Sequence, residues 1–199
     1  MYLADKLTLM RVILSPVFFI IYLLPSKAVW TVPALIVIFV CSEVTDLLDG
    51  QAARKRNEVS DFGKLFDPFA DTIMQITCFL CFMLDGIFPV FLFLIVVYRE
   101  FSILFIRNLM LKNGITLGAR LGGKIKTISF VVAASVALLA VSVERLTAGI
   151  QQLAVFEFMV PYIKIGALVF FIISVIFSVG SFIDYLLLYL KTIKDKNDK

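Results

Sequence analysis

The stretch 46–71 is rich in acids and lies between two long apolar runs, at 32–40 and 72–84. Four of its acids are Asp46, Asp49, Asp67 and Asp71. Because the apolar runs are typical of membrane helices, we expect these acids near or inside a bilayer. One ionised side chain at the centre of a membrane helix costs roughly 2.5–3.5 kcal/mol, so four uncompensated ones would cost on the order of 10 kcal/mol. The cations nearby do not obviously suffice to neutralise them, which favours bound metal.

The spacing of the acids indicates how they could share such metal. Asp46 and Asp49 are three residues apart, and Asp67 and Asp71 are four apart, so each pair lies on one face of a helix. Two antiparallel helices joined by a short loop could direct both pairs into one space. Facing carboxylate pairs suit two divalent ions about 3.5–4 Å apart, which clamp phosphate oxygens during an in-line displacement. The chain has no histidine, and the four acids offer only oxygen ligands, which favour Mg²⁺, Mn²⁺ or Ca²⁺.

Small and basic residues accompany the acids. Gly50 and Ala53 add no side-chain bulk, so a pyrophosphate or a flat group could approach the helix backbone there. Arg54 offers a bidentate donor for phosphate. Acids at helix ends often merely face water or pair with Lys and Arg. Four of them on two inward stripes, beside Gly50, Arg54 and Gly63, point instead to phosphate chemistry.

The elements that must position these residues are membrane helices. Of the 199 residues, 61% are hydrophobic, well above the roughly 45–50% of soluble domains. The apolar runs approach the length of a transmembrane helix, about 20 residues, which favours helices over barrel strands. We predict an all-α integral membrane protein in which a single domain, 1–199, has six spans. They cover 8–24, 29–54, 63–84, 89–111, 121–143 and 162–190.

The distribution of Lys and Arg predicts the orientation. With a cytoplasmic amino terminus, all but three of the nineteen basic residues fall on the cytoplasmic side or in cytoplasmic helix ends. The exceptions are Lys27, Arg145 and Lys164. Both termini and the active site are then cytoplasmic, in a multi-pass protein of the cell membrane. The first apolar run has no small-residue cleavage site and is expected to be a retained span, and 151–158, which is mixed in polarity, is expected along the membrane surface.

The acidic motif as a whole resembles that of a known family. D-x-x-D-G-x-x-A-R from Asp46, followed by G-x-x-x-D-x-x-x-D from Gly63, matches the signature of the CDP-alcohol phosphotransferases at every fixed position. The plan of six helices is also similar to this family over nearly the whole chain. The resemblance implies an enzyme that displaces CMP from a CDP-linked lipid with the hydroxyl group of a small alcohol.

The resemblance also implies roles for individual residues. The four aspartates would hold two Mg²⁺ or Mn²⁺ ions, and Asp71 would also be the base that takes the proton of the acceptor. The CDP-lipid would be bound by Thr8, Gly50, Ala53, Arg54 and Ser60. Of these, Thr8 lies in D-K-L-T-L-M-R, which is similar to an N-x-x-T-x-x-R start that borders the nucleotide site. The family further implies a homodimer.

The second half of the chain resembles the phosphatidylglycerophosphate synthases within this family. Tyr98-Arg99-Glu100 with Arg107, and the run 123–127 (G-K-I-K-T), carry this likeness. It implies CDP-diacylglycerol as the donor and sn-glycerol 3-phosphate as the acceptor. A phosphorylated alcohol needs a second basic pocket, for which the candidates are Arg107, Arg120, Lys124 and Lys126. Arg99 and Glu100 are expected to form an ion pair between helices.

Other functions remain open at this level. The same chemistry could act on another acceptor, such as phosphatidylglycerol or inositol phosphate, and Thr72 stands where the family usually has Lys directly after the last acid. Acids inside the membrane also mark ion pathways, so a divalent-cation transporter is a second class. A transporter would more naturally place its acids near mid-membrane on several helices, and a structural scaffold has no use for the cluster. No nucleic-acid partner is expected.

Overall fold

The computed structural model describes residues 3–56, 61–112 and 121–197, with side chains for 8–45, 66–110 and 122–192. These residues form six α-helices and one 3₁₀ helix. They are α1 (Leu3–Tyr22), α2 (Thr31–Arg56), α3 (Asp61–Leu84), α4 (Val90–Lys112), α5 (Leu121–Gly149), η1 (Gln151–Met159) and α6 (Val160–Asn197). The prediction of an all-α chain with six long helices is confirmed for this part of the chain.

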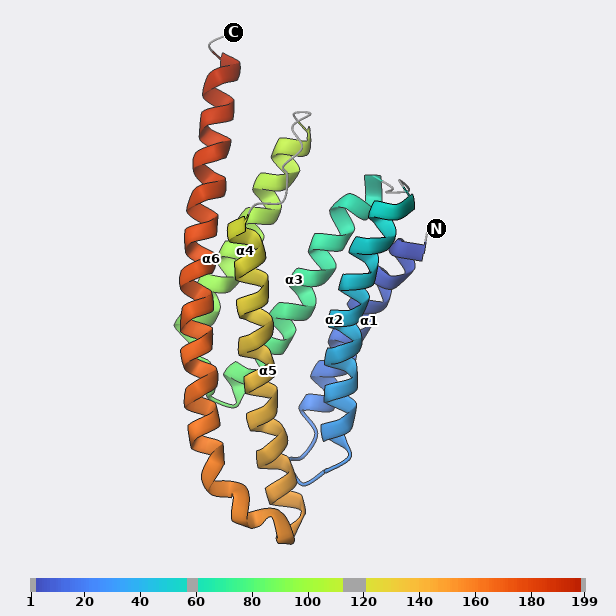
Figure 1. The fold of residues 1–199 in the computed structure, drawn as a ribbon, viewed down its shortest axis with the longest axis vertical. Coiled ribbons are helices and arrows are strands. Elements are labelled where there is room, and N and C mark those ends of the chain that lie inside the picture. The colour runs from blue at the N-terminus through green and yellow to red at the C-terminus, as the bar shows by residue number, and fades with distance from the viewer. Residues whose placement is uncertain (1–2, 57–60, 113–120, 198–199) are drawn as a thin grey trace.

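The helices form an elongated bundle with two halves (Figure 1). In one half α1 packs against α2 and α3, and in the other α5 packs along α6, which also contacts α4. The turn after α3 connects the halves, and there Gly86 has a φ of 69°, a left-handed conformation that glycine adopts without a steric penalty. The carboxyl-terminal end of α6 extends beyond the other helices in Figure 1.

Three segments are long and apolar enough to cross a membrane, judged by length and composition over the described residues. They are Phe66–Leu84, Gly122–Gly149 and Gln151–Thr192, while Thr8–Tyr22 and Thr31–Thr45 are apolar but shorter. Charged residues, among them Arg99 and Glu100, interrupt the apolar sequence of α4. The six predicted helices are therefore present, and three of the segments have the length and composition of a full span.

The last two helices depart most from their predicted bounds. α6 continues to Asn197, beyond its predicted end at residue 190. α5 continues to Gly149, beyond its predicted end at residue 143, and the segment expected along the membrane surface is the 3₁₀ helix η1. Figure 1 shows η1 at the lower end of the bundle, where it turns the chain from α5 into α6.

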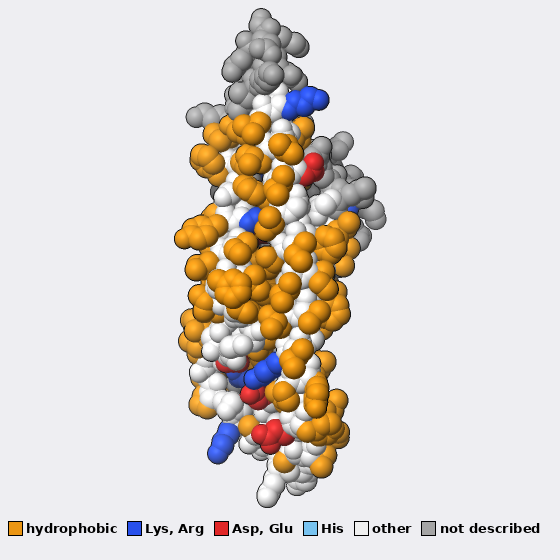
Figure 2. Space-filling view, turned by 90° about the vertical axis from the view of Figure 1, so that its left-hand side faces the viewer, with side chains coloured by type: hydrophobic (Ala, Val, Ile, Leu, Met, Phe, Trp, Pro, Cys, Tyr) orange, Lys and Arg blue, Asp and Glu red, His pale blue; other side chains and the backbone are white. Residues whose placement is uncertain are grey.

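The surface is strongly apolar. Figure 2 shows one face of the bundle covered by hydrophobic side chains along most of its length. Elsewhere in the chain too, large apolar side chains are exposed, for example Phe91, Phe105 and Ile128. Soluble monomers rarely expose contiguous apolar surface on this scale, so the outer surface is suited to contact with lipid tails.

An aromatic core fixes the two halves against each other. Phe79 of α3 lies with its ring centre 5.1 Å from that of Phe130 on α5 and 5.0 Å from that of Phe171 on α6. Phe88, in the turn between the halves, stacks on Phe171 with ring centres 3.9 Å apart. Such aromatic pairs contribute about 0.5–1.5 kcal/mol each beyond their buried area. Because Phe79 and Phe130 also line the cavity described below, this core sets the distance between its walls.

A buried polar cluster holds the carboxyl-terminal end of α1 and the start of α2 against α5. Arg145 of α5 donates to the hydroxyl oxygen of Thr31 at 2.8 Å and to the backbone carbonyl of Tyr22 at 2.5 Å. The carbonyls in the last turn of a helix lack partners inside the helix, so Arg145 satisfies one at the end of α1. The Tyr22 hydroxyl in turn donates to Asp85 at 2.5 Å. Arg145 is one of the three basic residues that fall outside the predicted cytoplasmic side. Its hydrogen bonds show that it stabilises the packing of the helices.

Candidate active site

Two of the predicted acids, Asp67 and Asp71, are held by a buried arginine from α1. Nη2 of Arg11 donates to Oδ1 of Asp67 at 2.6 Å, and its Nη1 contacts Oδ1 of Asp71. The Thr8 hydroxyl also donates to Oδ1 of Asp67, at 3.4 Å. The side chain of Arg11 is 1% exposed, whereas that of each acid is 41% exposed. The cation is therefore fixed inside the bundle while the carboxylates reach open space.

The local sequence explains this arrangement. Thr8 and Arg11 are three residues apart on α1, and Asp67 and Asp71 are four apart on α3, so each pair projects from one face of its helix. The next residue, Thr72, donates its hydroxyl to the carbonyl of Pro68 at 2.8 Å, within the same helix. The position directly after the last acid thus carries a buried neutral side chain whose hydroxyl is already bonded.

The two remaining predicted metal ligands are on α2. Its helical backbone runs through Asp46 and Asp49, which stand within one turn of each other. The side chains of Asp46, Asp49, Gly50, Ala53 and Arg54 lie outside the described residues, as do Ser60 and Arg120. Among the described residues, no group of three or more His, Cys, Asp or Glu side chains is placed to bind a metal. The cluster of four acids therefore stays a prediction.

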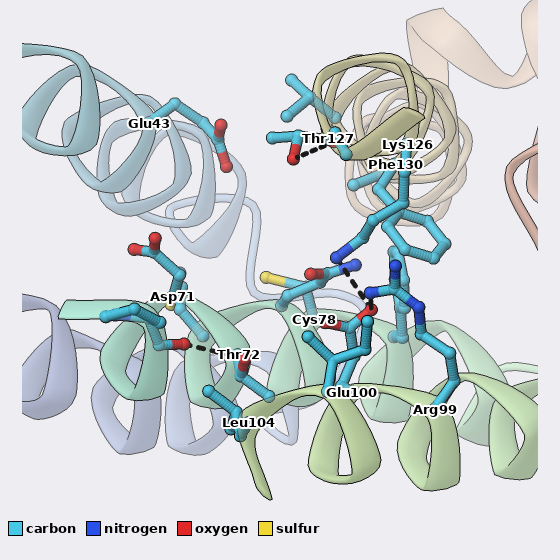
Figure 3. Close-up of a pocket in the computed structure, with 18 of the residues that line it drawn as sticks. Glu43, Asp71, Thr72, Cys78, Arg99, Glu100, Leu104, Lys126, Thr127 and Phe130 are labelled. Carbon is cyan, nitrogen blue, oxygen red and sulfur yellow. Dashed lines mark hydrogen bonds and ion pairs between the residues drawn. The ribbon is translucent and has the colours of Figure 1, made fainter. Parts of the chain in front are cut away.

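A cavity of about 280 Å³ lies beside Asp71, between the two halves of the bundle. All six α-helices contribute to its lining. Figure 3 shows Glu43 and Asp71 on one side of the cavity and Arg99, Glu100 and Lys126 on the other. Its volume is near the lower end of small-molecule sites, roughly 300–1,000 Å³. The cavity therefore suits a small ligand that is polar at both ends.

The wall opposite Asp71 contains a buried ion network. Oε1 of Glu100 accepts from Nη1 of Arg99 and from Nζ of Lys126, both at 2.7 Å. Nε of Arg99 donates to the backbone carbonyl of Ser178 at 3.0 Å, and Nζ of Lys126 lies 5.0 Å from the centre of the Phe130 ring. The predicted ion pair between Arg99 and Glu100 forms, but both residues are on α4, so the prediction that it joins two helices is wrong. The ion pair between helices joins Glu100 on α4 to Lys126 on α5. Arg99 reaches α6 through the Ser178 carbonyl.

This network leaves one positive charge in excess, since two cations share one acid. Arg107 and Lys124 line the same cavity, and the guanidinium of Arg107 lies 5.7 Å from the centre of the Tyr185 ring. Three of the four residues predicted to bind the acceptor phosphate, Arg107, Lys124 and Lys126, thus line one cavity together with Asp71. Electrostatic attraction is stronger in such a partly desolvated space than in water, so this wall suits an anion.

Comparison with known proteins identifies the family. Residues 1–177 match the sequence profile described as CDP-alcohol phosphatidyltransferase. The chain belongs to this family. Over 98% of its length it is 35% identical to the CDP-diacylglycerol–glycerol-3-phosphate 3-phosphatidyltransferase of Treponema pallidum, 92% of which is covered. The protein of the same name from Bacillus subtilis is 32% identical over 69% of the chain and 76% of that relative. The one from Escherichia coli K12 is 43% identical over a shorter stretch, 34% of the chain and 36% of that relative.

As a CDP-alcohol phosphatidyltransferase, the chain is an enzyme of phospholipid biosynthesis and a multi-pass membrane protein. This explains the hydrophobic surface in Figure 2. The family predicted from the motif 46–71 is confirmed, and membership favours group transfer over the transporter and scaffold alternatives.

The CDP-alcohol phosphatidyltransferases use a divalent metal ion, and the described acids fit one. Asp67 and Asp71 supply carboxylate oxygens, the hard ligands that Mg²⁺ and Mn²⁺ prefer. Both contacts with Arg11 use the Oδ1 atom of the acid, and 41% of each acidic side chain is exposed, so carboxylate surface remains for a cation. Arg11 offsets one of the two negative charges and orients both acids.

Two residues of this candidate site are not among those predicted from the sequence. Arg11 is a fixed position of the N-x-x-T-x-x-R start from which only Thr8 was selected, and the spacing of three already places both on one helix face. Glu43, which lines the cavity, lies three residues before Asp46 on α2. In both cases the helical spacing to a predicted residue is the signal that identifies the missing one.

Proposed function

We propose that this enzyme transfers a phosphatidyl group from CDP-diacylglycerol to sn-glycerol 3-phosphate, forming phosphatidylglycerol phosphate and CMP. The observation that carries this proposal is the match over 98% of the chain to the Treponema pallidum protein, whose name states this donor and this acceptor. The cavity supports it. An acid on one side and cations on the other suit an acceptor with a hydroxyl group at one end and a phosphate at the other.

In this proposal the acceptor phosphate binds at the basic wall. Its partners are Arg107, Arg120, Lys124 and Lys126. An ammonium group has three N–H donors, and that of Lys126 gives one to Glu100. Glu100 thereby fixes the direction of Lys126 while other donors of the ammonium group can reach a phosphate oxygen.

The acceptor hydroxyl reacts at the opposite side, next to Asp71. Its oxygen attacks the phosphorus that is linked to diacylglycerol, a new P–O bond forms, and the P–O bond to CMP breaks. CMP leaves with the electron pair of that bond, and the hydroxyl proton passes to the Asp71 carboxylate. The buried guanidinium of Arg11 holds this carboxylate at the cavity, so the base is positioned before the acceptor arrives.

The donor and the metal occupy the side of the acidic motif. The CDP group would contact Thr8, Gly50, Ala53, Arg54 and Ser60. Two Mg²⁺ or Mn²⁺ ions, held by Asp46, Asp49, Asp67 and Asp71, would neutralise the negative charge of the pyrophosphate when bound. Thr8 donates to Asp67, which supports a place for it next to the metal-binding acids.

The topology and assembly complete the proposal. One domain, 1–199, would cross the cell membrane six times, with both termini and the active site on the cytoplasmic side, and would form a homodimer. The bias of Lys and Arg supports this orientation. Arg145, which this orientation places away from the cytoplasmic side, is bonded to Thr31 and Tyr22 inside the bundle, so its position there is consistent with the orientation.

The test is CMP release by the purified protein. It would receive CDP-diacylglycerol, Mg²⁺ and, in separate reactions, glycerol 3-phosphate, glycerol, inositol phosphate or phosphatidylglycerol. We expect CMP release with glycerol 3-phosphate at a higher rate than with the other acceptors. A higher rate with another acceptor would show that glycerol 3-phosphate is not the preferred acceptor. No CMP release with any of them would refute the transfer reaction.

A further inference from the structure

One buried amide in the cavity has no part in the reaction described so far. Gln75 of α3 lies four residues beyond Asp71, and both side chains line the cavity. The Nε2 atom of Gln75 is buried and has no hydrogen-bond partner among the described residues. Leaving a buried donor unpaired is unfavourable, because the group has lost its hydrogen bonds to water. A donor left unpaired on the wall of a substrate cavity indicates that a bound molecule supplies its partner.

We propose that Gln75 selects the acceptor by donating a hydrogen bond to its non-reacting hydroxyl group. This inference rests on the function proposed above. The acceptor has a reacting hydroxyl at one end, a phosphate at the other, and a second hydroxyl between them. Gln75 is about 6 Å along α3 from Asp71, at 1.5 Å of rise per residue. The phosphate-binding candidates Lys124 and Lys126 stand on a different helix, so the middle of the acceptor passes between α3 and α5.

The chemistry of the neighbouring side chains supports this assignment. On α3, Asp71 is engaged by Arg11, and the Thr72 hydroxyl is engaged by the carbonyl of Pro68. Met74, which also lines the cavity, has no N–H or O–H donor in its side chain. A neutral amide suits a hydroxyl group, whereas the cations of the opposite wall suit the phosphate. Gln75 is thus equipped for the uncharged part of the acceptor.

A hydrogen bond of this kind gives specificity as well as affinity. A site that is built to bond a substrate hydroxyl discriminates against an analogue that lacks it, because the buried donor is then unpaired. The wild-type enzyme should therefore prefer glycerol 3-phosphate to propane-1,3-diol monophosphate, in which hydrogen replaces the middle hydroxyl.

The experiment measures kcat/KM for the two acceptors with the wild type and with Gln75→Met. This change keeps the side-chain length and removes the amide. We expect Gln75→Met to lose about 10-fold in kcat/KM for glycerol 3-phosphate. The same variant should keep the wild-type value for the analogue. Met74→Leu, an apolar change in the same cavity, is the matched control and should leave the ratio between the two acceptors unchanged. The melting temperature of Gln75→Met should equal or exceed that of the wild type, because an unpaired buried amide has been removed.

Two outcomes with a folded Gln75→Met variant would overturn the inference. Equal losses with both acceptors would show a general effect on the site, and a change only in the KM for CDP-diacylglycerol would place Gln75 at the donor. If Gln75→Met fails to fold, Gln75→Asn, which shortens the reach of the amide, must show the same selective loss. Wild-type enzyme that releases CMP with another acceptor but not with glycerol 3-phosphate would refute the proposed function, and this role with it.

Discussion

Replacing Arg11 by Met should destabilise the enzyme through the two acids on α3. Arg11 is 1% exposed and makes a charged contact with each of Asp67 and Asp71. A hydrogen bond to a charged group contributes about 1.5–3 kcal/mol, so two would contribute about 3–6 kcal/mol. Each acid is 41% exposed and gains solvation by water and ions once Arg11 is absent. Because solvent screens these half-exposed acids, the two contacts should contribute less than this sum. We expect Arg11→Met to lower the free energy of unfolding by about 2–3 kcal/mol.

The assay is thermal unfolding in detergent. In a chain of this size about 1 kcal/mol shifts Tm by roughly 2–4 °C, so Arg11→Met should lower Tm by roughly 4–12 °C. Lys164→Met is the matched control. Lys164 also pairs with an acid, Glu144 at 2.8 Å, but the two side chains are 27% and 43% exposed. Such a surface pair contributes up to about 1 kcal/mol, so the control should lower Tm by a smaller amount.

Two further variants decide whether the acids carry the effect. Arg11→Lys keeps the charge but loses the planar fork that reaches both carboxylates, so its Tm should fall between those of the wild type and Arg11→Met. In the Asp71→Asn background, Arg11→Met should cost less than in the wild type, because one partner has lost its charge. Fully additive losses, or a Tm for Arg11→Met equal to that of Lys164→Met, would refute this reasoning.

The remaining predictions concern catalysis, the acceptor and packing. A chelator should abolish CMP release and added Mg²⁺ or Mn²⁺ should restore it, since carboxylates such as Asp67 bind hard cations; full turnover without divalent ions would contradict a metal-dependent reaction. Asp71→Asn should lower turnover by about 10²–10⁴-fold while CDP-diacylglycerol still binds, and near-normal turnover would remove Asp71 as the base. Lys124→Glu should raise the KM for glycerol 3-phosphate far more than that for the lipid, whereas an effect confined to the lipid would assign Lys124 to the donor. Arg145→Met should lower Tm because Arg145 holds the end of α1, and an unchanged Tm would show that its hydrogen bonds with Thr31 and Tyr22 contribute nothing.

The helices could be predicted from sequence because continuous apolar runs of about 20 residues suit membrane helices rather than barrel strands. The third run, predicted at 63–84, is found as Asp61–Leu84. The fifth was predicted to end at 143, before the charged residues Glu144 and Arg145. It continues because Arg145 is bonded to Tyr22 and Thr31 and Glu144 pairs with Lys164, so neither charge needs to leave the bundle.

For the site, the sequence predicts which residues share a face of one helix, because this depends only on their spacing. Such spacing correctly indicates that Asp67 and Asp71 share a face of α3. It does not indicate which residue of another helix stands opposite them. Arg11 lies on α1, and the partner of Glu100 is Lys126 on α5, so both pairings depend on how the helices pack. The unpaired amide of Gln75 is likewise visible only once the cavity walls are in place.

The most direct test of the proposed reaction follows one oxygen atom. Glycerol 3-phosphate with a heavy-oxygen label in its reacting hydroxyl would be incubated with the enzyme, CDP-diacylglycerol and Mg²⁺, and both products would be examined by mass spectrometry. We expect one phosphatidylglycerol phosphate for each CMP, with the label in the lipid and none in CMP, because the hydroxyl oxygen attacks the lipid phosphorus. Label in CMP, or CMP released without a labelled lipid, would contradict phosphatidyl transfer to this acceptor.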